Sequence, residues 1–508
     1  MKKQGGNKRS FSAVFSVSFV LLAAKIIGFI KQIVVANAFG ATTETDIIAL
    51  SQGVITDFEF LIAQTMITAF IPIYISVKER QSGEKRFVSN VIKLFAVISF
   101  GISTLVFLLS PMITKIIAPS FKGDVAVSLT HNIRIYSYTL VLLTITAIFN
   151  ALLKANQSFL PGEITSIIQS VSFIICVYIF GSIFSVKALI ISFFVYVTIN
   201  AFYLTLYSRK FWRIEWKVFS FDDDVKKLLK MISPLLFGYA MIYINQMVDK
   251  ILATGIGDGA VTSMSYSSVL GNFITGFIAS ICGVAFTYVA SNVAQKSDKK
   301  AATIVGYFVT CFVTVLIPVT LITVINAKEI VTIVYGRGAY DATAVENSAF
   351  ALMGYGSMFI QCAIREMFTR LQYSYQESRK PTINNTISII ANIVLSIVLS
   401  RLWGILGITI ATSVSVLISA VLNVISSRKY NSYLHIRFFK KYWIPWIIGG
   451  IACLSTDIIL TNHLTIENLY FRFVIICISS FVAYGIPIAP IAIGIVKKRT
   501  SVFSSGKE

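Results

Sequence analysis

Fourteen apolar runs of 17 or more residues divide this chain of 508 residues almost from end to end. About 20 consecutive apolar residues suffice for one helix to cross the hydrocarbon core of a bilayer. Because that core holds no water for the backbone polar groups, each run must satisfy its own hydrogen bonds as a helix. Only 13% of the residues are charged, against roughly 25% in a soluble domain. The sequence therefore predicts an all-α polytopic membrane protein with fourteen transmembrane helices.

The predicted helices follow one another through short connections. They cover residues 11–37, 44–75, 88–110, 133–153, 162–182, 187–208, 231–253, 262–293, 303–325, 347–368, 382–402, 404–427, 442–461 and 472–496. Of the 44 lysines and arginines, 31 fall in segments on the same side as the N-terminus, eight in the opposite loops and five within helices. Because positive residues concentrate in cytoplasmic loops, both termini are expected in the cytoplasm.

Several classes of function are excluded by what the sequence lacks. The net charge of +21 does not indicate nucleic acid, because the basic residues punctuate the hydrophobic runs instead of gathering in one solvated domain. The six cysteines have no CxxC spacing and the three histidines form no HExxH motif, so no metal site is expected. No Walker A loop occurs, and the glycine cluster at 255–259 is typical of a tight turn. We therefore expect no cofactor and no enzyme active site, and the chain alone is not a cassette-type ATP-driven transporter.

Charged residues inside the predicted membrane segments are the candidate functional residues. Lys25 and Lys31 lie within the first segment, where a charge costs roughly 2.5–3.5 kcal/mol near the bilayer centre. Two cations there indicate a polar cavity that receives an anion; the alternative is that they pair with carboxylates and hold helices together. Asp57 and Glu59, in the second segment, are two residues apart and point to nearly opposite sides of a helix. One of them is expected to face the cavity or to pair with a lysine.

A second set of charges lies near predicted helix ends and is assigned to gating or coupling. Asp46 stands at the outer start of helix 2, where it caps its own helix or contacts the other half of the protein. Asp249 and Lys250 end helix 7 near the outer surface, and Arg365 and Glu366 lie near the cytoplasmic end of helix 10. For these four residues the alternative is an interfacial position from which the side chain reaches water.

The chain also contains a weak internal repeat. Lys31 is followed nine residues later by the Gly-Ala pair at 40–41, and Lys250 nine residues later by the pair at 259–260. A hydrophobic run of 32 residues follows each pair. These runs exceed one span, so tilt, kinks or extension beyond the bilayer are expected. The repeat recurs six helices on, which favours two lobes related by an axis along the membrane normal.

Residues 25–41, 45–46 and 69–72 resemble the opening signature of the MurJ (MviN) lipid II flippases, within the MOP exporter superfamily. Residues 335–341 are similar to the Arg-Gly-Ala-Phe loop of that family between helices 9 and 10. The resemblance implies two six-helix lobes in a V around a central cavity, with an added helix pair 13–14. It places the N-terminal lobe and linker at 1–230, the C-terminal lobe at 231–430, and the helix pair with a cytoplasmic tail at 431–508.

The resemblance also implies an activity and a location. Members move an undecaprenyl-diphosphate-linked cell-wall precursor, lipid II, from the inner to the outer leaflet of the bacterial plasma membrane by alternating access. The implied partners are this lipid-linked glycan, membrane lipids and cell-wall synthesis proteins. The implied substrate-binding residues are Lys25 and Lys31, with Asp57 and Glu59 beside them.

The family pattern is not followed throughout, which leaves the glycan open. Lysines replace family arginines at Lys25 and Lys31, which keeps the charge but loses the bidentate guanidinium. Glu59 stands at or beside a third arginine position and Val269 at a fourth. A capsule, exopolysaccharide or teichoic-acid repeat unit on the same lipid is therefore the alternative substrate. A cation-coupled multidrug exporter is favoured less, because fourteen helices and intramembrane lysines count against it.

Overall fold

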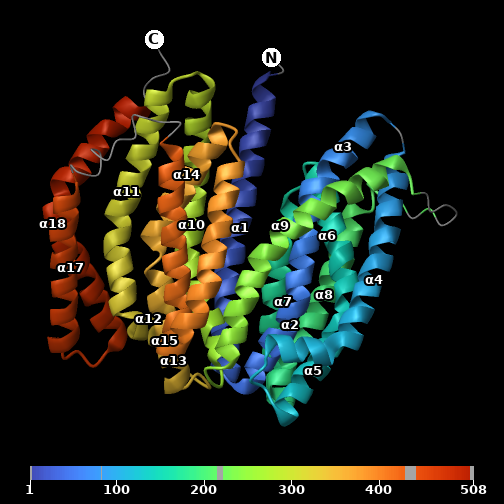
Figure 1. The fold of residues 1–508 in the computed structure, drawn as a ribbon, viewed down its shortest axis with the longest axis horizontal. Helices are drawn as coiled ribbons and strands as arrows, with labels where there is room; N and C mark the ends of the chain where they lie inside the picture. The colour runs from blue at the N-terminus through green and yellow to red at the C-terminus, as the bar shows by residue number, and fades with distance from the viewer. Residues whose placement is uncertain (1–2, 82, 214, 216–220, 429–441, 504–508) are drawn as a thin grey trace. The chain divides into compact units, whose positions relative to one another are not determined.

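The computed structural model describes residues 3–81, 83–213, 215, 221–428 and 442–503. Within these ranges the regular elements are helices (Figure 1). The chain divides into two compact units. The first unit comprises Met1–Thr262 and Arg337–Asp341, and the second comprises Ser263–Gly336 and Ala342–Glu508.

The helices of the first unit follow the apolar runs of the sequence. They are α1 (Lys3–Phe39), α2 (Thr43–Thr65), the π-helical turn η1 (Met66–Phe70), α3 (Ile71–Glu79), α4 (Glu84–Ile117), α5 (Gly123–Ser137), α6 (Thr139–Ala155), α7 (Leu160–Phe184), the 3-10 turn η2 (Ser185–Lys187), α8 (Ala188–Ser208) and α9 (Asp223–Thr254).

The remaining helices belong mainly to the second unit. They are α10 (Ala260–Ala294), α11 (Asp298–Ile325), α12 (Ala327–Tyr335), α13 (Ala342–Gly356), α14 (Phe359–Ser374), α15 (Arg379–Ser427), α17 (Trp443–His463) and α18 (Leu469–Phe503).

The spans of this multi-pass membrane protein agree with the predicted number. Ten helical stretches of the described chain are long and apolar enough to cross a membrane, and α5 with α6 form an eleventh, bent by 44°. Two of the ten are 49 residues long and contain two helices each, joined at η2 or at Gly404, whose φ of +57° reverses the chain. The helices α13 and α14, separated at 357–358, take the place of the predicted helix 347–368. The prediction of fourteen transmembrane helices is therefore confirmed.

The second span contains the kink that its length predicted. It extends from Thr43 to Glu79, and five of its residues, Met66–Phe70, form a π-helical turn. Pro72 follows directly, in the first turn of α3. Because proline lacks a backbone N–H and crowds the preceding turn, a widened turn before it relieves the conflict and redirects the helix. By contrast, α10 continues for 35 residues without a break.

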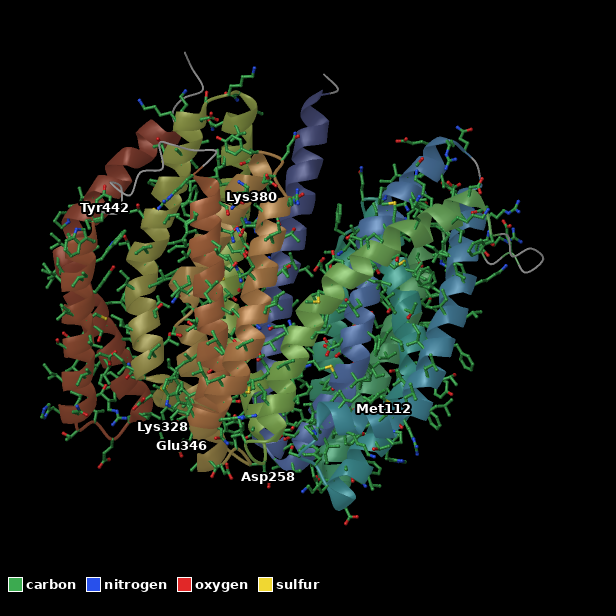
Figure 2. The ribbon with its side chains drawn as sticks, in the orientation of Figure 1. Met112, Asp258, Lys328, Glu346, Lys380 and Tyr442 are labelled. Atoms are coloured by element: carbon green, nitrogen blue, oxygen red, sulfur yellow. The ribbon has the colours of Figure 1, made fainter. Side chains whose placement is uncertain are left out.

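Each unit has a buried core and an apolar outer surface. In the first unit the core lies where α3, α4 and α6 meet, around Phe70, Tyr74 and Phe149. On the other side of α4 large apolar side chains are exposed, among them Met112 (Figure 2). Exposed apolar residues along a helix of this length are the surface expected to face lipid.

In the second unit, α11 carries the last two helices. Trp446 of α17 donates a hydrogen bond to Thr314 Oγ1 (3.0 Å), and the hydroxyl of Tyr484 in α18 donates to the carbonyl of Thr314 (2.8 Å). Asn326 donates to buried Asp457 of α17 (2.8 Å). Since polar bonds inside an apolar environment have no competing water, they fix α17 and α18 to α11.

The three-part division implied by the family resemblance stays a prediction. Its boundary at residue 230 falls within α9, which packs with α2 and α4. The boundary at residues 430–431 lies outside the described residues. The two compact units are groups of packed residues and do not test this division.

Candidate functional site

The two lysines of the first span occupy different surroundings. Lys31 lies with its ammonium group 5.2 Å from the ring centre of Phe173, on the neighbouring helix α7. Lys25 is exposed on α1. In the part of the chain that the structure describes, neither lysine forms an ion pair with a carboxylate. The arrangement leaves both positive charges available to an anion, with the π-face of Phe173 stabilising one of them.

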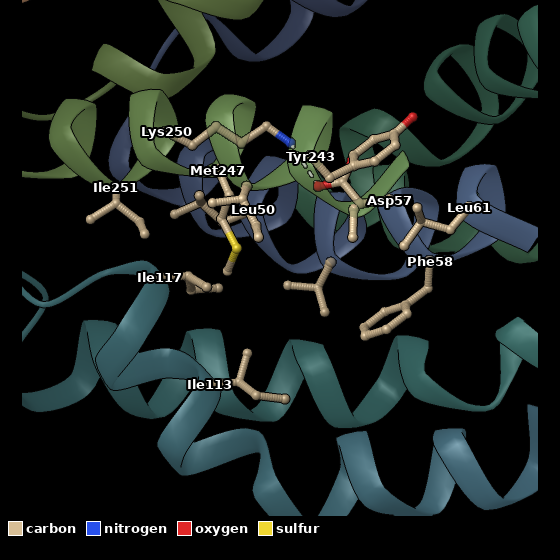
Figure 3. Close-up of a pocket in the computed structure, with 13 residues that line it drawn as sticks. Leu50, Asp57, Phe58, Leu61, Ile113, Ile117, Tyr243, Met247, Lys250 and Ile251 are labelled. Atoms are coloured by element: carbon tan, nitrogen blue, oxygen red, sulfur yellow. Dashed lines mark hydrogen bonds and ion pairs between the residues drawn. The ribbon is translucent and has the colours of Figure 1, made fainter. Parts of the chain in front are cut away.

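Asp57 pairs with a lysine, as one of the two carboxylates was expected to do, but the lysine comes from α9. The ammonium group of Lys250 lies 3.3 Å from Asp57 Oδ2, so the pair joins α2 to α9 (Figure 3). Gly53, one turn earlier on α2, provides the space: a Cβ there would lie 3.2 Å from the same ammonium group. Both side chains remain partly exposed, at 31% and 27%.

An apolar cavity of about 280 Å³ borders this ion pair. It is formed by α2, α4 and α9, with Asp57, Tyr243 and Lys250 as its polar groups (Figure 3). The apolar lining residues are Leu50, Val54, Phe58, Leu61, Ile113, Ile117, Ala240, Ile244, Met247 and Ile251. An ion pair beside so much apolar surface is poorly screened, so breaking it costs more than breaking a solvated pair.

The other two acidic candidates on these helices lie close to the pair in sequence. Glu59 is half-buried on α2, and no hydrogen bond or ion pair joins it to another residue of the described ranges. Asp249 precedes Lys250 on α9 and is half-buried. The geometry therefore ties Asp57 to Lys250 and leaves Glu59 as a separate intramembrane carboxylate.

Three loops of the first unit interlock through their backbones; we call residues 37–46, 259–262 and 337–341 the loop cluster. The amide of Ala339 donates to the carbonyl of Asn37 (2.9 Å). A Cβ built on Gly338 would overlap that same carbonyl oxygen, and one built on Gly259 would overlap the carbonyl of Ala41. Both glycines have positive φ, +61° and +73°. Only glycine allows the loops to approach so closely in this conformation.

The side chain of Asp46 also forms hydrogen bonds within the loop cluster. Its Oδ1 accepts hydrogen bonds from the amide (2.7 Å) and the hydroxyl (2.6 Å) of Thr262, in the first turn of α10. The cap of its own helix is provided instead by Thr42 and Thr45, which bond reciprocally. Asp46 is 1% exposed. A buried carboxylate at a helix N-terminus is stabilised by the free amides and the helix dipole, so it holds α2 to the start of α10.

In the second unit, Arg365 and Glu366 form an ion pair at 3.1 Å on α14. Arg370 also lies close to Glu366, at 3.6 Å. It was not among the predicted site residues, because the predicted helix 10 ended at residue 368. The four-residue spacing of Glu366 and Arg370, which places them on one helix face, was the available signal. Thr262, which bonds to Asp46, and Phe173, which contacts Lys31, could not be found in this way, because each lies far from its partner in the sequence.

Comparison with known proteins finds relatives along most of the chain. The family profile described as lipid II flippase MurJ matches residues 35–479. The probable lipid II flippase MurJ of Rickettsia prowazekii is 24% identical over 486 residues, covering 92% of this chain and 94% of the relative. That of Treponema pallidum is 21% identical over 421 residues, covering 80% of this chain and 79% of the relative.

Solved structures share the fold. A structure of lipid II flippase MurJ in an inward closed conformation matches with a TM-score of 0.81 at 19% identity, over 95% of this chain and 100% of that chain. An inward-facing multidrug resistance MATE family transporter of the MOP superfamily matches with a TM-score of 0.66 at 14% identity, over 82% and 98%. The match to the first structure is closer and extends further along the chain.

Proposed function

This chain belongs to the lipid II flippase MurJ family, and we propose that it carries lipid II from the inner to the outer leaflet of a bacterial plasma membrane by alternating access. The observation that carries the proposal is the family match across residues 35–479, which spans helices of both compact units. The relatives are lipid II flippases by name, so we favour lipid II over a capsule, exopolysaccharide or teichoic-acid unit. The weaker match to MATE transporters supports a multidrug exporter less.

The proposed transport step requires positive charges that stabilise the diphosphate, and it requires no covalent reaction. A diphosphate-sugar headgroup cannot enter hydrocarbon without losing its hydration, whereas the lipid tail never leaves it. We assign Lys25 and Lys31 as cations that replace lost hydration around the diphosphate, since neither is paired with a carboxylate in the described residues. No covalent bond changes in such a step, so we propose a transporter without catalytic residues or cofactor.

We further propose that the loop cluster closes the outer side of the transport path. Its segments 259–262 and 337–341 lead directly into α10 and α13, whose remaining residues belong to the second unit. Separating them from α1 and α2 breaks the Asp46–Thr262 and Asn37–Ala339 bonds together. With both termini in the cytoplasm, as the distribution of lysine and arginine predicts, this cluster lies on the outer face.

Transport by the purified full chain in vesicles tests the proposed function. We expect labelled lipid II to reach the opposite leaflet, and a capsule-type undecaprenyl diphosphate repeat unit to move more slowly. Expression of the chain should also restore growth to cells depleted of their own lipid II flippase. Faster movement of the capsule-type unit, with no rescue of growth, would reject lipid II as the substrate.

The same vesicles test which driving force makes the transport directional. Since the sequence has no Walker A loop, we propose that the membrane potential biases the cycle, each elementary charge moved being worth about 2.3 kcal/mol per 100 mV. Transport is expected to slow when the potential is dissipated. An unchanged rate in depolarised vesicles would leave the substrate gradient as the driver.

Breaking the Asp57–Lys250 pair is expected to slow transport. Either Asp57→Asn or Lys250→Gln removes one charge and leaves its partner unpaired beside an apolar cavity. A partly exposed pair is worth up to about 1 kcal/mol, so the equilibrium between transport states shifts roughly fivefold. The flip rate in vesicles measures the loss, and the exchange Asp57→Lys with Lys250→Asp should restore most of it. An exchange no better than either single variant would show that the pair itself is not required.

A further inference from the structure

In the second unit, one helix carries three charged residues close together while a neighbouring helix carries none. Along its whole length, Ala260–Ala294, α10 has no aspartate, glutamate, lysine, arginine or histidine. Its neighbour in the same core, α14, carries Arg365, Glu366 and Arg370 within two turns. The guanidinium of Arg370 reaches across to α10 and donates to the carbonyl of Ala279 (3.4 Å).

One carboxylate is shared between the two guanidinium groups. Arg365 Nη2 lies 3.1 Å from Glu366 Oε1, and Arg370 Nη2 lies 3.6 Å from Glu366 Oε2. The three side chains are between 26% and 28% exposed. The group therefore has a net charge of +1, is partly exposed, and is too dry for its charges to be fully screened.

The guanidinium of Arg370 has one donor without an acceptor. Its Nε is buried and has no hydrogen-bond partner, while Nη2, on the same edge, donates to the carbonyl of Ala279 at 3.4 Å and lies 3.6 Å from Glu366 Oε2. That edge is the one through which arginine binds two oxygens of a phosphate or carboxylate in parallel. A buried charged donor without an acceptor is costly, so an anion that bonds to Nε and replaces the long Nη2 contacts is stabilised there.

The depth of the group suits the phosphates of one leaflet. With a rise of about 1.5 Å per residue, Arg370 and Arg365 lie roughly 6 and 14 Å from the end of α14 at Ser374. The sequence places that end at the cytoplasmic surface. A diphosphate that enters from the inner leaflet would therefore meet Arg370 first and Arg365 about 8 Å deeper.

We propose that Arg365 and Arg370 form a diphosphate-binding site in which lipid-linked substrate is first held on the cytoplasmic side, with Glu366 as the internal counter-ion that the diphosphate displaces. The inference rests on the proposed function and specifies the substrate group that this part of the protein recognises. Two guanidinium groups around one carboxylate match two adjacent phosphates, whereas a phospholipid offers a single phosphodiester. A diphosphate is therefore favoured over an ordinary anionic lipid.

Binding of undecaprenyl diphosphate to the full chain in nanodiscs of neutral lipid tests the site. Arg370→Gln and Arg365→Gln should each weaken binding about 10- to 100-fold, the range for losing hydrogen bonds to a charged group. Glu366→Gln should strengthen binding severalfold, because it removes the competing carboxylate. Arg379→Gln, an exposed arginine nine residues after Arg370 with the same charge change, should leave binding unchanged.

The Glu366 variant separates a binding site from a purely structural ion-pair group. If the group only stabilised the fold, Glu366→Gln would weaken binding as the arginine variants do, and that result would overturn the proposal. Equal binding by Arg370→Gln and the unchanged protein would overturn it too, as would equally strong displacement by phosphatidylglycerol. Arg370→Lys keeps the charge without the two-pronged edge and should bind with intermediate affinity, which guards against a folding defect.

Failure of this inference is distinguishable from failure of the proposed function. A chain that moves lipid II while Arg370→Gln binds normally would reject the site alone. A chain that binds undecaprenyl diphosphate through Arg370 but does not move lipid II would reject the proposed function and support the site.

Discussion

Gly338→Val is expected to abolish transport while leaving the protein in the membrane at its usual level. Gly338 has a φ of +61°, and a Cβ there would overlap the carbonyl oxygen of Asn37. A β-branched residue is strained in this conformation, and the overlap forces the loop away from α1. The Ala339–Asn37 hydrogen bond is then lost, and the loop cluster cannot close. Rescue of flippase-depleted cells and membrane abundance are the measurements.

Gly257→Val is the matched control for this prediction. Gly257 lies in a loop of the same unit, two residues before the cluster, yet a Cβ there would have no atom within 4 Å. The control should support growth normally. Normal growth with Gly338→Val would show that the close approach of the loops is not needed for transport.

The double variant Lys25→Gln with Lys31→Gln is expected to lose transport altogether. Each lysine is an intramembrane cation with no carboxylate partner among the described residues, and under the proposed function its charge binds the diphosphate. A hydrogen bond to a charged group is worth about 1.5–3 kcal/mol, and two such losses lower affinity for the diphosphate more than a hundredfold. Lys→Arg at both positions should retain most activity, since it keeps both charges.

The control and the contrary outcome are both simple to obtain. Lys122→Gln removes an exposed lysine from a loop outside the membrane spans and should have no effect. Flip rates in vesicles, normalised to protein inserted, compare the variants. Full activity of the double Lys→Gln variant would reject a direct role for these cations.

The spans could be predicted from the sequence because apolar length alone determines them. Their ends could not, because several helices continue past the hydrocarbon with polar residues. The predicted run 88–110 is part of a helix that extends from Glu84 to Ile117. The break at 357–358 was also missed, since neither residue there is a strong helix breaker.

The candidate residues were easier to find than their partners. An isolated charge in an apolar run is visible in the sequence, and so Asp57 and Lys250 were both identified. Their pairing joins positions 193 residues apart, which no local pattern reports. The Gly-Ala turns at 40–41 and 259–260 were likewise recognised as turns, whereas the close approach of Gly40 to Ala339 and of Gly259 to Ala41 depends on the fold.

The loop cluster has a consequence for how the protein is made. Asn37 and Ala339 meet although about 300 residues separate them, and the first compact unit includes Arg337–Asp341. At roughly 5–20 residues per second, the ribosome needs about 4–16 s to proceed from Thr262 to Asp341. Throughout that interval α1 and α2 are already synthesised, but residues 337–341, which contact the end of α1, are not. The first unit is thus completed only after two thirds of the chain has been translated, and a chain that ends before Arg337 lacks the hydrogen bond that holds the end of α1 to residues 337–341.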